Sequence, residues 1–212
     1  MATDQVTEKV GQLDLNDGLS PTVFKSTDDF TVTHPLSHKW TLWYTRPPVN
    51  SKEDWKNLLK EIVTVSTVEE FWGMFNSIPK VDELQLRSDY SFFRDGIRPE
   101  WEDQANGAGG KIVYVLPHKR SQNAITADEA WLKTLLGVIG GTLDNDTGMI
   151  TGVFINVRRA GTRVNIWTSK TRPEDQLKAI AQKFKELLQL GRNDEVEFTA
   201  HDSSNKKDNW II

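Results

Sequence analysis

Residues 152–169, GVFINVRRAGTRVNIWTS, contain two segments in which apolar and polar side chains alternate. Gly152 to Arg158 and Arg163 to Ser169 flank the short connection Arg159-Ala160-Gly161-Thr162, a pattern that predicts a β-hairpin. Successive side chains of a strand point to opposite faces, so this hairpin has one apolar side and one polar side. The apolar side is expected to pack against helices and consists of Val153, Ile155, Val157, Val164 and Ile166.

The opposite side of the hairpin carries Asn156, Arg158, Arg163, Asn165 and Trp167. Arginine suits phosphate because its planar guanidinium group bonds two oxygens at once, and a tryptophan ring adds a flat stacking surface. This side is therefore a candidate surface for an anionic ligand with an aromatic ring. The alternative is a solvent-exposed strand face shielded by one tryptophan, and periodicity alone favours that alternative.

The remaining segments predict an α+β fold. Three helices are expected, and two of them begin at capping patterns, Thr67 to Glu70 and Thr126 to Glu129. The second helix is expected to stop at Gly140-Gly141, and the third to have Pro173 in its first turn and to end at Gly191. A largely antiparallel sheet covered by these helices on one face fits this order. Its further strands are Lys39 to Thr45, Tyr90 to Arg94, Lys111 to Leu116 and Glu195 to His201.

Length and composition indicate one folded domain with an N-terminal tail. Residues 1–33 are polar without a hydrophobic period and are expected to be a flexible tail, whereas residues 34–212 are expected to form a single domain. The net charge of −4 argues against general electrostatic binding of long nucleic acids. Without cysteine there is no disulfide framework or thiolate metal site, and no segment predicts a membrane span or a secretory signal.

Tryptophan is frequent, with eight residues, and two tryptophans lie among charged residues. Trp101 lies in the segment Arg98-Pro99-Glu100-Trp101-Glu102-Asp103, an expected loop, and Trp55 follows Glu53-Asp54. A carboxylate beside an aromatic ring suits guanine, because the ring stacks on the base while the carboxylate accepts its N–H groups. The alternative for Trp101 is a ring that only anchors the loop to the domain.

Catalytic patterns are weak throughout the sequence. His34, His38, His118 and His201 lack the spacing of a metal site, and there is no nucleophile elbow, phosphate-binding loop or dinucleotide motif. We therefore expect no catalytic residues, no metal and no cofactor.

Seven motifs, taken together, resemble the eukaryotic translation initiation factor 4E family. They occur in family order between about residues 34 and 170, and the resemblance implies a curved sheet with the three helices on its convex face. The motifs are His34-Pro35-Leu36, Trp40-Thr41-Leu42-Trp43-Tyr44, Thr67-Val68-Glu69-Glu70-Phe71-Trp72, Arg98-Pro99-Glu100-Trp101-Glu102-Asp103, Trp131-Leu132 to Leu136, Asn156-Val157-Arg158 and Ile166-Trp167-Thr168.

The resemblance implies that the chain binds the 7-methylguanosine cap of messenger RNA. Trp55 and Trp101 would sandwich the methylated base, whose positive charge adds cation–π attraction to stacking. Glu102 would accept hydrogen bonds from the N1 and N2 donors of guanine, and Trp167 would contact the methyl group. The ligand is thus a capped messenger RNA or a cap analogue.

The triphosphate of the cap would be held by Arg158 and Arg163, with Lys111 as a helper. The sequence departs from the common family pattern here, because the basic residue expected two positions after Arg158 is Ala160. Arg159 is basic instead, but its side chain is expected to point to the opposite face.

A second site is implied on the helix side, where a short helical motif of a 4G-type scaffold initiation factor or of a 4E-binding repressor would bind. From pattern alone, Val68, Trp72 and Leu136 look like core residues. A departure beside this site is Lys133, where an acidic residue is often found. Apart from this site, position 112 is isoleucine where many relatives have tryptophan, which we interpret as a packing change. The residues implied in partner binding are His34, Pro35, Val68, Trp72, Leu132 and Leu136.

Four functions remain open at this point. The chain is expected to be a general initiation factor, and a cap-binding translational repressor of the same family is the first alternative. An enzyme acting on capped or nucleotide substrates and an adaptor without a ligand are the other two. The resemblance implies a location in the cytoplasm and allows the nucleus as well.

Overall fold

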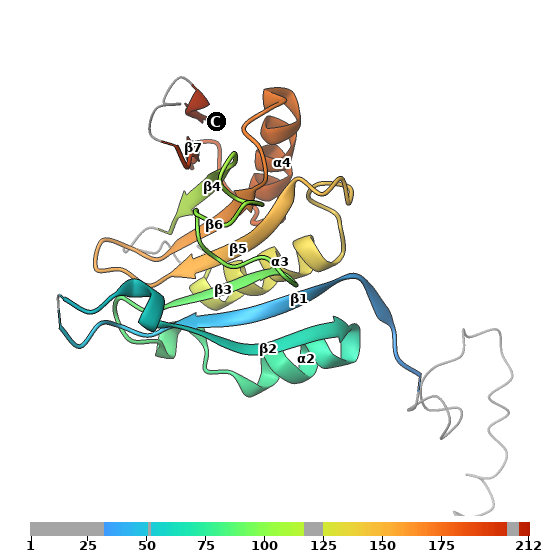
Figure 1. The fold of residues 1–212 in the computed structure, drawn as a ribbon. Coiled ribbons are helices and arrows are strands. Elements are labelled where there is room, and N and C mark those ends of the chain that lie inside the picture. The colour runs from blue at the N-terminus through green and yellow to red at the C-terminus, as the bar shows by residue number, and fades with distance from the viewer. Residues whose placement is uncertain (1–31, 51, 117–124, 203–207) are drawn as a thin grey trace, which may run out of the picture. The chain divides into compact units, whose positions relative to one another are not determined.

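Eight antiparallel strands form one curved sheet in the computed structural model, which describes residues 32–50, 52–116, 125–202 and 208–212 (Figure 1). The strand order across the sheet is β2-β1-β3-β5-β6-β4-β7-β8. Each α-helix follows a pair of consecutive strands along the chain, and the predicted α+β class is confirmed. The strands are β1 (Pro35–Thr45), β2 (Leu59–Thr67), β3 (Asp89–Arg94), β4 (Gly110–Val115), β5 (Ile150–Asn156), β6 (Arg163–Thr168), β7 (Val196–Ala200) and β8 (Trp210–Ile211).

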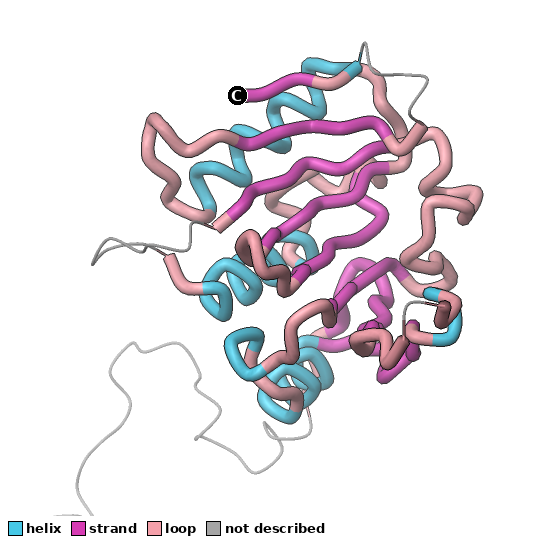
Figure 2. The backbone as a smooth tube through the Cα atoms, turned by 90° about the vertical axis from the view of Figure 1, so that its left-hand side faces the viewer, coloured by secondary structure: helices cyan, strands magenta, loops and turns pink. Residues whose placement is uncertain are grey.

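The helices α2 (Val68–Ser77), α3 (Ala127–Ile139) and α4 (Glu174–Leu187) lie along one face of this sheet, as Figures 1 and 2 show. Both predicted N-caps are present, because Thr67 accepts the N–H of Glu70 and Thr126 accepts the N–H of Glu129. Two short 3₁₀ turns, η2 (Trp55–Asn57) and η3 (Val81–Glu83), complete the elements. Within the described residues, no α-helix covers the other face of the sheet.

The predicted hairpin has the expected faces. In the β5–β6 pair, Val153 lies opposite Ile166 and Ile155 lies opposite Val164, and all four side chains are buried. Strand β5 begins and ends two residues earlier than expected, at Ile150 and Asn156, and β6 ends one residue early, at Thr168. The alternation of a strand therefore does not extend to Arg158, and other contacts determine where that side chain lies.

Two strands and one helix end were not predicted correctly. Strand β2 was missed because most of its residues are exposed, as is usual at a sheet edge, so its sequence lacks clean alternation. Strand β8 was missed because it has only two residues. Helix α4 ends at Leu187 instead of at Gly191, and Pro173 is its N-cap residue. Most of the predicted tail, residues 1–31, lies outside the described residues.

The hydrophobic core lies between the sheet and the three helices. Phe71, Trp131 and Phe184, one from each helix, are fully buried with sheet residues such as Ile112 and Ile155. Burying each such side chain contributes roughly 1.5–3 kcal/mol. Position 112 is thus a packing position, in agreement with the interpretation of its isoleucine. No helix in the described part of the chain is long and apolar enough to span a membrane.

Candidate functional site

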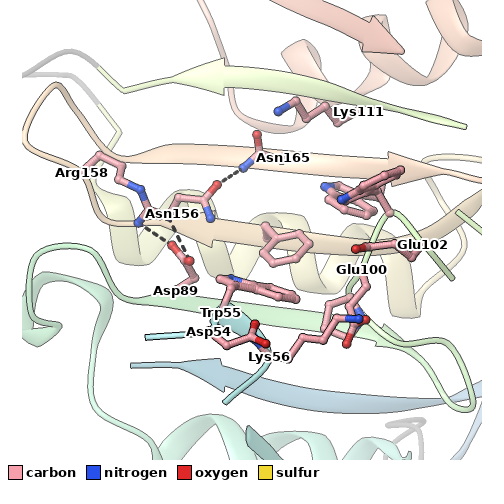
Figure 3. A pocket seen from close by; sticks show the side chains of 14 residues that line it. Asp54, Trp55, Lys56, Asp89, Glu100, Glu102, Lys111, Asn156, Arg158 and Asn165 are labelled. Carbon is pink, nitrogen blue, oxygen red and sulfur yellow. Dashed lines mark hydrogen bonds and ion pairs between the residues drawn. The ribbon is translucent and has the colours of Figure 1, made fainter. Parts of the chain in front are cut away.

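The open face of the sheet contains a pocket with a volume of about 450 Å³ (Figure 3). The loop between β1 and β2, the loop between β3 and β4, and strands β4, β5 and β6 all contribute residues to it. All residues that the resemblance assigns to cap binding, except Arg163, line this pocket. The lining consists of Asp54, Trp55, Lys56, Asp89, Pro99, Glu100, Trp101, Glu102, Lys111, Phe154, Asn156, Arg158, Asn165 and Trp167.

Trp101 and Glu102 are presented by an internally hydrogen-bonded loop. The buried Asn106 side chain donates to the carbonyl oxygens of Arg98 (2.9 Å) and Glu100 (2.8 Å). The Asp103 carboxylate accepts the backbone N–H of Arg98 at 2.9 Å. These bonds hold the loop while the Trp101 ring stays 62% exposed, so it does not serve to anchor the loop to the core.

The Glu102 side chain is exposed and makes no hydrogen bond or ion pair with any residue in the described ranges. Its neighbour Glu100 is different, because its carboxylate is buried and accepts two hydrogen bonds from the Arg98 guanidinium at 2.8 and 2.6 Å. Of these two pocket carboxylates, Glu102 is therefore the one able to accept hydrogen bonds from a ligand.

Trp55 lies on the other side of the pocket, in the 3₁₀ turn η2 (Figure 3). Asp54 caps this turn by accepting the backbone N–H of Lys56 at 3.0 Å. The preceding loop is held by an ion pair between Arg46 and Glu53. The Trp55 side chain is 37% exposed and lines the pocket, so its ring is accessible to a planar ligand there.

Trp167 is packed into an aromatic cluster on the open face of the sheet. Its ring centroid lies 5.6 Å from that of Phe93, 5.0 Å from that of Phe154 and 4.1 Å from that of His201. Gly152 makes this cluster possible, because a Cβ atom there would lie 2.3 Å from the Phe93 ring. The cluster fixes the orientation of Trp167 in the pocket.

His201 is the unexpected member of this cluster. Burial lowers the pKa of His201 to about 4, and the positive charge of Lys111 acts in the same direction. The imidazole is therefore neutral at physiological pH and packs against Trp167 as an aromatic ring. Its Nε2 atom is buried without a hydrogen-bond partner among the described residues.

Arg158 is held by an internal carboxylate. Its guanidinium donates to both oxygens of Asp89, at 2.6 and 3.0 Å (Figure 3). It also donates to the carbonyl oxygens of Ser88 and Val157. Asp89 is buried, so this bidentate pair is screened from solvent on one side. These contacts, and not strand alternation, bring Arg158 to the pocket.

Lys111 lines the pocket from β4, directly across from Trp167 on β6. Burial lowers the pKa of Lys111, the nearby Arg163 charge lowers it further, and Glu197 opposes both effects. Arg163 lies on the same face of the sheet, exposed, but beyond the pocket lining. Arg159 is also exposed and is not among the lining residues.

The pocket thus combines two accessible indole rings, a free carboxylate and cationic side chains. This set suits a planar cationic or electron-poor ring carrying N–H donors, joined to an anionic group. Within the described residues, no cluster of three or more histidine, aspartate or glutamate side chains has the arrangement of a metal site.

Several supporting residues were missed at the sequence level. Asp89, Phe93, Phe154 and His201 are separated in sequence from the residues that they support, and each acts through a cross-strand or loop contact. The sequence offered one signal, since Phe154 alternates onto the same face as Asn156. Asn156 was placed on the correct face and accepts a hydrogen bond from Asn165.

The residues implied in partner binding lie on the helix side. Trp72 on α2 and Leu136 on α3 remain 38% and 37% exposed, although their pattern had suggested core positions, whereas Val68 and Leu132 are half-buried. The core interpretation of Trp72 and Leu136 is wrong, because α2 and α3 turn their Phe71 and Leu135 side chains to the core instead.

The entry to β1 is tied to the first turn of α2. The carbonyl of His34 accepts the N–H of Val68, and the His34 ring lies 2.6 Å from the Glu69 carboxylate. The hydrogen bond from His34 lowers the pKa of Glu69 to about 2. Pro35 is exposed beside these contacts, and Lys133 on α3 pairs with Glu129 at 3.0 Å.

Comparison with known families agrees with this architecture. The family model of eukaryotic initiation factor 4E matches residues 35–210. The eukaryotic translation initiation factor 4E of Candida albicans is 44% identical over 205 residues, which cover 97% of this chain and 96% of the relative. That of Saccharomyces cerevisiae is 41% identical over 208 residues, covering 97% and 95%.

Solved structures give the same result. The chain is similar to eIF4E-3 of Ascaris suum in complex with m7G cap, with a TM-score of 0.75, 33% identity and coverage of 81% of this chain and 93% of that chain. It is also similar to eIF4E-3 of C. elegans in complex with the 4E-binding protein Mextli and cap analog, with a TM-score of 0.76, 31% identity and coverage of 85% and 100%. This chain therefore belongs to the eukaryotic initiation factor 4E family.

Proposed function

We propose that this protein binds the 7-methylguanosine cap of messenger RNA and recruits other initiation factors to start translation, without catalysing a reaction. The observation that supports the proposal most directly is the pocket itself, in which Trp55, Trp101 and Glu102 meet cationic side chains on the open face of the sheet. Relatives solved with m7G cap have the same fold.

The base is recognised by stacking and by hydrogen bonds. Trp55 and Trp101 enclose the methylated guanine, whose delocalised positive charge is attracted to both indole faces. Glu102, which has no partner within the described part of the chain, accepts hydrogen bonds from the N1 and N2 donors of the base. Trp167, held by Phe93 and Phe154, closes the side of the pocket toward the methyl group. Unmethylated guanine lacks the positive charge and the methyl group, which weakens the attraction to the indole rings and removes the contact with Trp167. Another base does not present the N1 and N2 donors to Glu102.

The triphosphate extends from the base toward Arg158 and Lys111, with Arg163 on the same face beyond them. Asp89 holds the Arg158 guanidinium in a fixed orientation before the ligand arrives, which reduces the entropy lost on binding. Lys111 is partly desolvated beside Trp167, and an anionic phosphate favours its charged form. The cap is bound at one end through its base and at the other through its phosphates.

The helix side serves as a separate docking surface for a partner. Trp72 on α2 and Leu136 on α3 are exposed apolar side chains, and we propose that they form an apolar patch, with Val68, Leu132, Pro35 and His34 around it, that binds a short amphipathic helix. Relatives were solved with the 4E-binding proteins Mextli and 4E-BP. The proposed partners are a 4G-type scaffold initiation factor and repressors that carry the same helical motif, and the proposed location is the cytoplasm.

Tryptophan fluorescence titration with 7-methyl-GTP beside unmethylated GTP tests cap recognition. Strong quenching by 7-methyl-GTP and little by GTP is expected, because only the methylated base is cationic. Equal weak responses to both nucleotides would reject the cap-binding proposal and favour an adaptor without a ligand.

Activator and repressor roles share cap binding, and they differ in the partner that the helix side binds. A pull-down on immobilised 7-methyl-GTP is expected to recover the scaffold factor. Recovery of the protein without scaffold factor would favour the repressor alternative.

A further inference from the structure

A second cavity of about 330 Å³ adjoins the pocket at Trp55. The two cavities share Trp55, Asp89 and Arg158 in their linings. Arg87 lines only the second cavity. A ligand held at Arg158 therefore lies at the border between the two cavities and has access to both.

The charges around the second cavity cancel in pairs, except at Arg87. Glu53 is engaged by Arg46, and Asp89 is engaged by Arg158. The Arg87 side chain is exposed and makes no hydrogen bond or ion pair with any residue in the described ranges. Among the described residues that line it, the cavity thus has an excess of one positive charge, carried by Arg87.

Arg87 occupies an unusual backbone conformation, with a φ angle of 72°, in the left-handed region that favours glycine. Its backbone N–H donates to the carbonyl of Val157 at 2.8 Å, and the N–H of Val157 donates to the carbonyl of Ser88 at 3.1 Å. These bonds join the turn before β3 to the residue next to Arg158. An arginine side chain is therefore attached at a strained position beside the proposed phosphate-binding arginine.

We propose that Arg87 and Arg158 form a second phosphate subsite, which binds a phosphate group of the capped RNA at the border of the two cavities. This proposal rests on the proposed cap-binding function and extends it. The phosphate belongs either to the triphosphate bridge of the cap or to the RNA chain that follows, and the chemistry of recognition is the same for both. Arg158 is anchored by Asp89, whereas Arg87 is free to adjust to the ligand.

Arg87→Gly tests the subsite, because glycine retains the left-handed backbone and removes only the side chain. Arg87→Lys retains a positive charge, and Arg192→Ala removes an exposed arginine from the turn between α4 and β7 as a matched control. Affinities for 7-methyl-GTP and for a capped RNA of about ten nucleotides are measured by isothermal titration calorimetry between about 50 and 200 mM salt. Melting temperatures of all variants check the fold.

Arg87→Gly is expected to weaken binding about 3- to 10-fold at about 50 mM salt and to reduce the salt dependence by roughly 0.7 in the slope of log K against log salt. Arg87→Lys and Arg192→Ala are expected to stay within about twofold of the original chain. A loss with both ligands assigns the subsite to the triphosphate bridge, and a loss with the capped RNA alone assigns it to the RNA chain.

Unchanged affinity of Arg87→Gly for both ligands at low salt would overturn the subsite. An equal loss in Arg87→Lys and Arg87→Gly would also overturn it, since the positive charge would then not matter. Failure of the cap-binding proposal is distinguishable, because the unsubstituted chain itself would then not distinguish 7-methyl-GTP from GTP.

Discussion

The pocket on the open face and the apolar patch on the helix side both expose tryptophan, but their surroundings differ. Trp55 and Trp101 are accompanied by Glu102 and by cations, of which Arg158 is fixed by the internal carboxylate of Asp89. Trp72 on α2 and Leu136 on α3 are exposed apolar side chains, and Lys133 on α3 is already paired with Glu129. The open face is suited to a charged planar ligand and the helix side to an apolar helix, so each site is expected to be separable from the other by mutation.

Trp101→Ala is expected to give the largest effect on ligand binding. Loss of stacking and cation–π attraction costs about 3 kcal/mol, which corresponds to roughly a 100-fold weaker affinity for 7-methyl-GTP by calorimetry. The melting temperature is expected to stay unchanged, because the ring is 62% exposed. A variant that binds the helical partner as before but not 7-methyl-GTP would support two independent sites. Loss of binding to both ligands would contradict their independence.

Trp72→Ala addresses the helix side. Removing this indole is expected to weaken the binding of a helical peptide of the scaffold type by about 2 kcal/mol, or roughly 30-fold. The affinity for 7-methyl-GTP is expected to stay unchanged. Phe71→Ala is the matched contrast, because Phe71 is fully buried next to it and its loss is expected to cost about 3–5 kcal/mol of stability. If Trp72→Ala impaired both sites as Phe71→Ala does, Trp72 would be a core residue and the two-site proposal would be wrong.

Glu102→Ala is expected to have a smaller effect on affinity and a larger one on selectivity. Leaving the N1 and N2 donors of the base without an acceptor costs about 1–3 kcal/mol. Titrations with 7-methyl-GTP and 7-methyl-ITP, which lacks the 2-amino group, are expected to differ for the original chain and to converge for the variant. Gln104→Ala, at an exposed position of the same loop, is the control. Retained preference for guanine in Glu102→Ala would place the base-reading group elsewhere.

The smallest predicted effect is a pH dependence of the free energy of unfolding that comes from His201. The ordinary pKa of His201 is 6.5 and burial lowers the pKa to about 4 in the folded protein. Between these values the unfolded chain binds a proton that the folded chain does not, so stability falls as pH falls through this window. From pH 7 to 5.5 the expected loss from this group is about 1 kcal/mol in denaturant unfolding.

His201→Phe provides the comparison for this pH effect, since it keeps an aromatic ring beside Trp167 without a titrating group. Its free energy of unfolding is expected to change less between pH 7 and 5.5 than that of the original chain. Identical pH dependence in both proteins would show that His201 does not contribute in this range.

Much of the open face was predictable because strand alternation is a local property. The hairpin sequence alone placed Asn156, Asn165 and Trp167 on the face opposite Val153 and Ile155, and the register confirms this. The resemblance supplied Trp55, Trp101 and Glu102, whose common location in one pocket was then visible in the structure. Their roles in cap binding remain predictions.

The support of these residues was not predictable in the same way. Asp89 reaches Arg158 across 69 positions of sequence, and His201 reaches Trp167 from a loop after β7. No local pattern marks such pairs, because sheet order and loop packing bring them together. The helical spacing of apolar residues on α2 wrongly predicted a core position for Trp72, because that spacing does not show whether another element covers the side chain.

The sequence by itself determined the elements with strong local signals: the hairpin faces, the capped starts of α2 and α3, and the motifs of the initiation factor 4E family. Tertiary structure alone decided which side chains became accessible and which became fixed. Trp101 is exposed because Asn106 and Asp103 hold its loop, and Arg158 is oriented because Asp89 is buried beside it. The contact between Arg158 and Asp89 joins segments 69 positions apart and forms only when the sheet is assembled. The bonds that hold the Trp101 loop span only five and eight positions, but no strand or helix period in the sequence marks them.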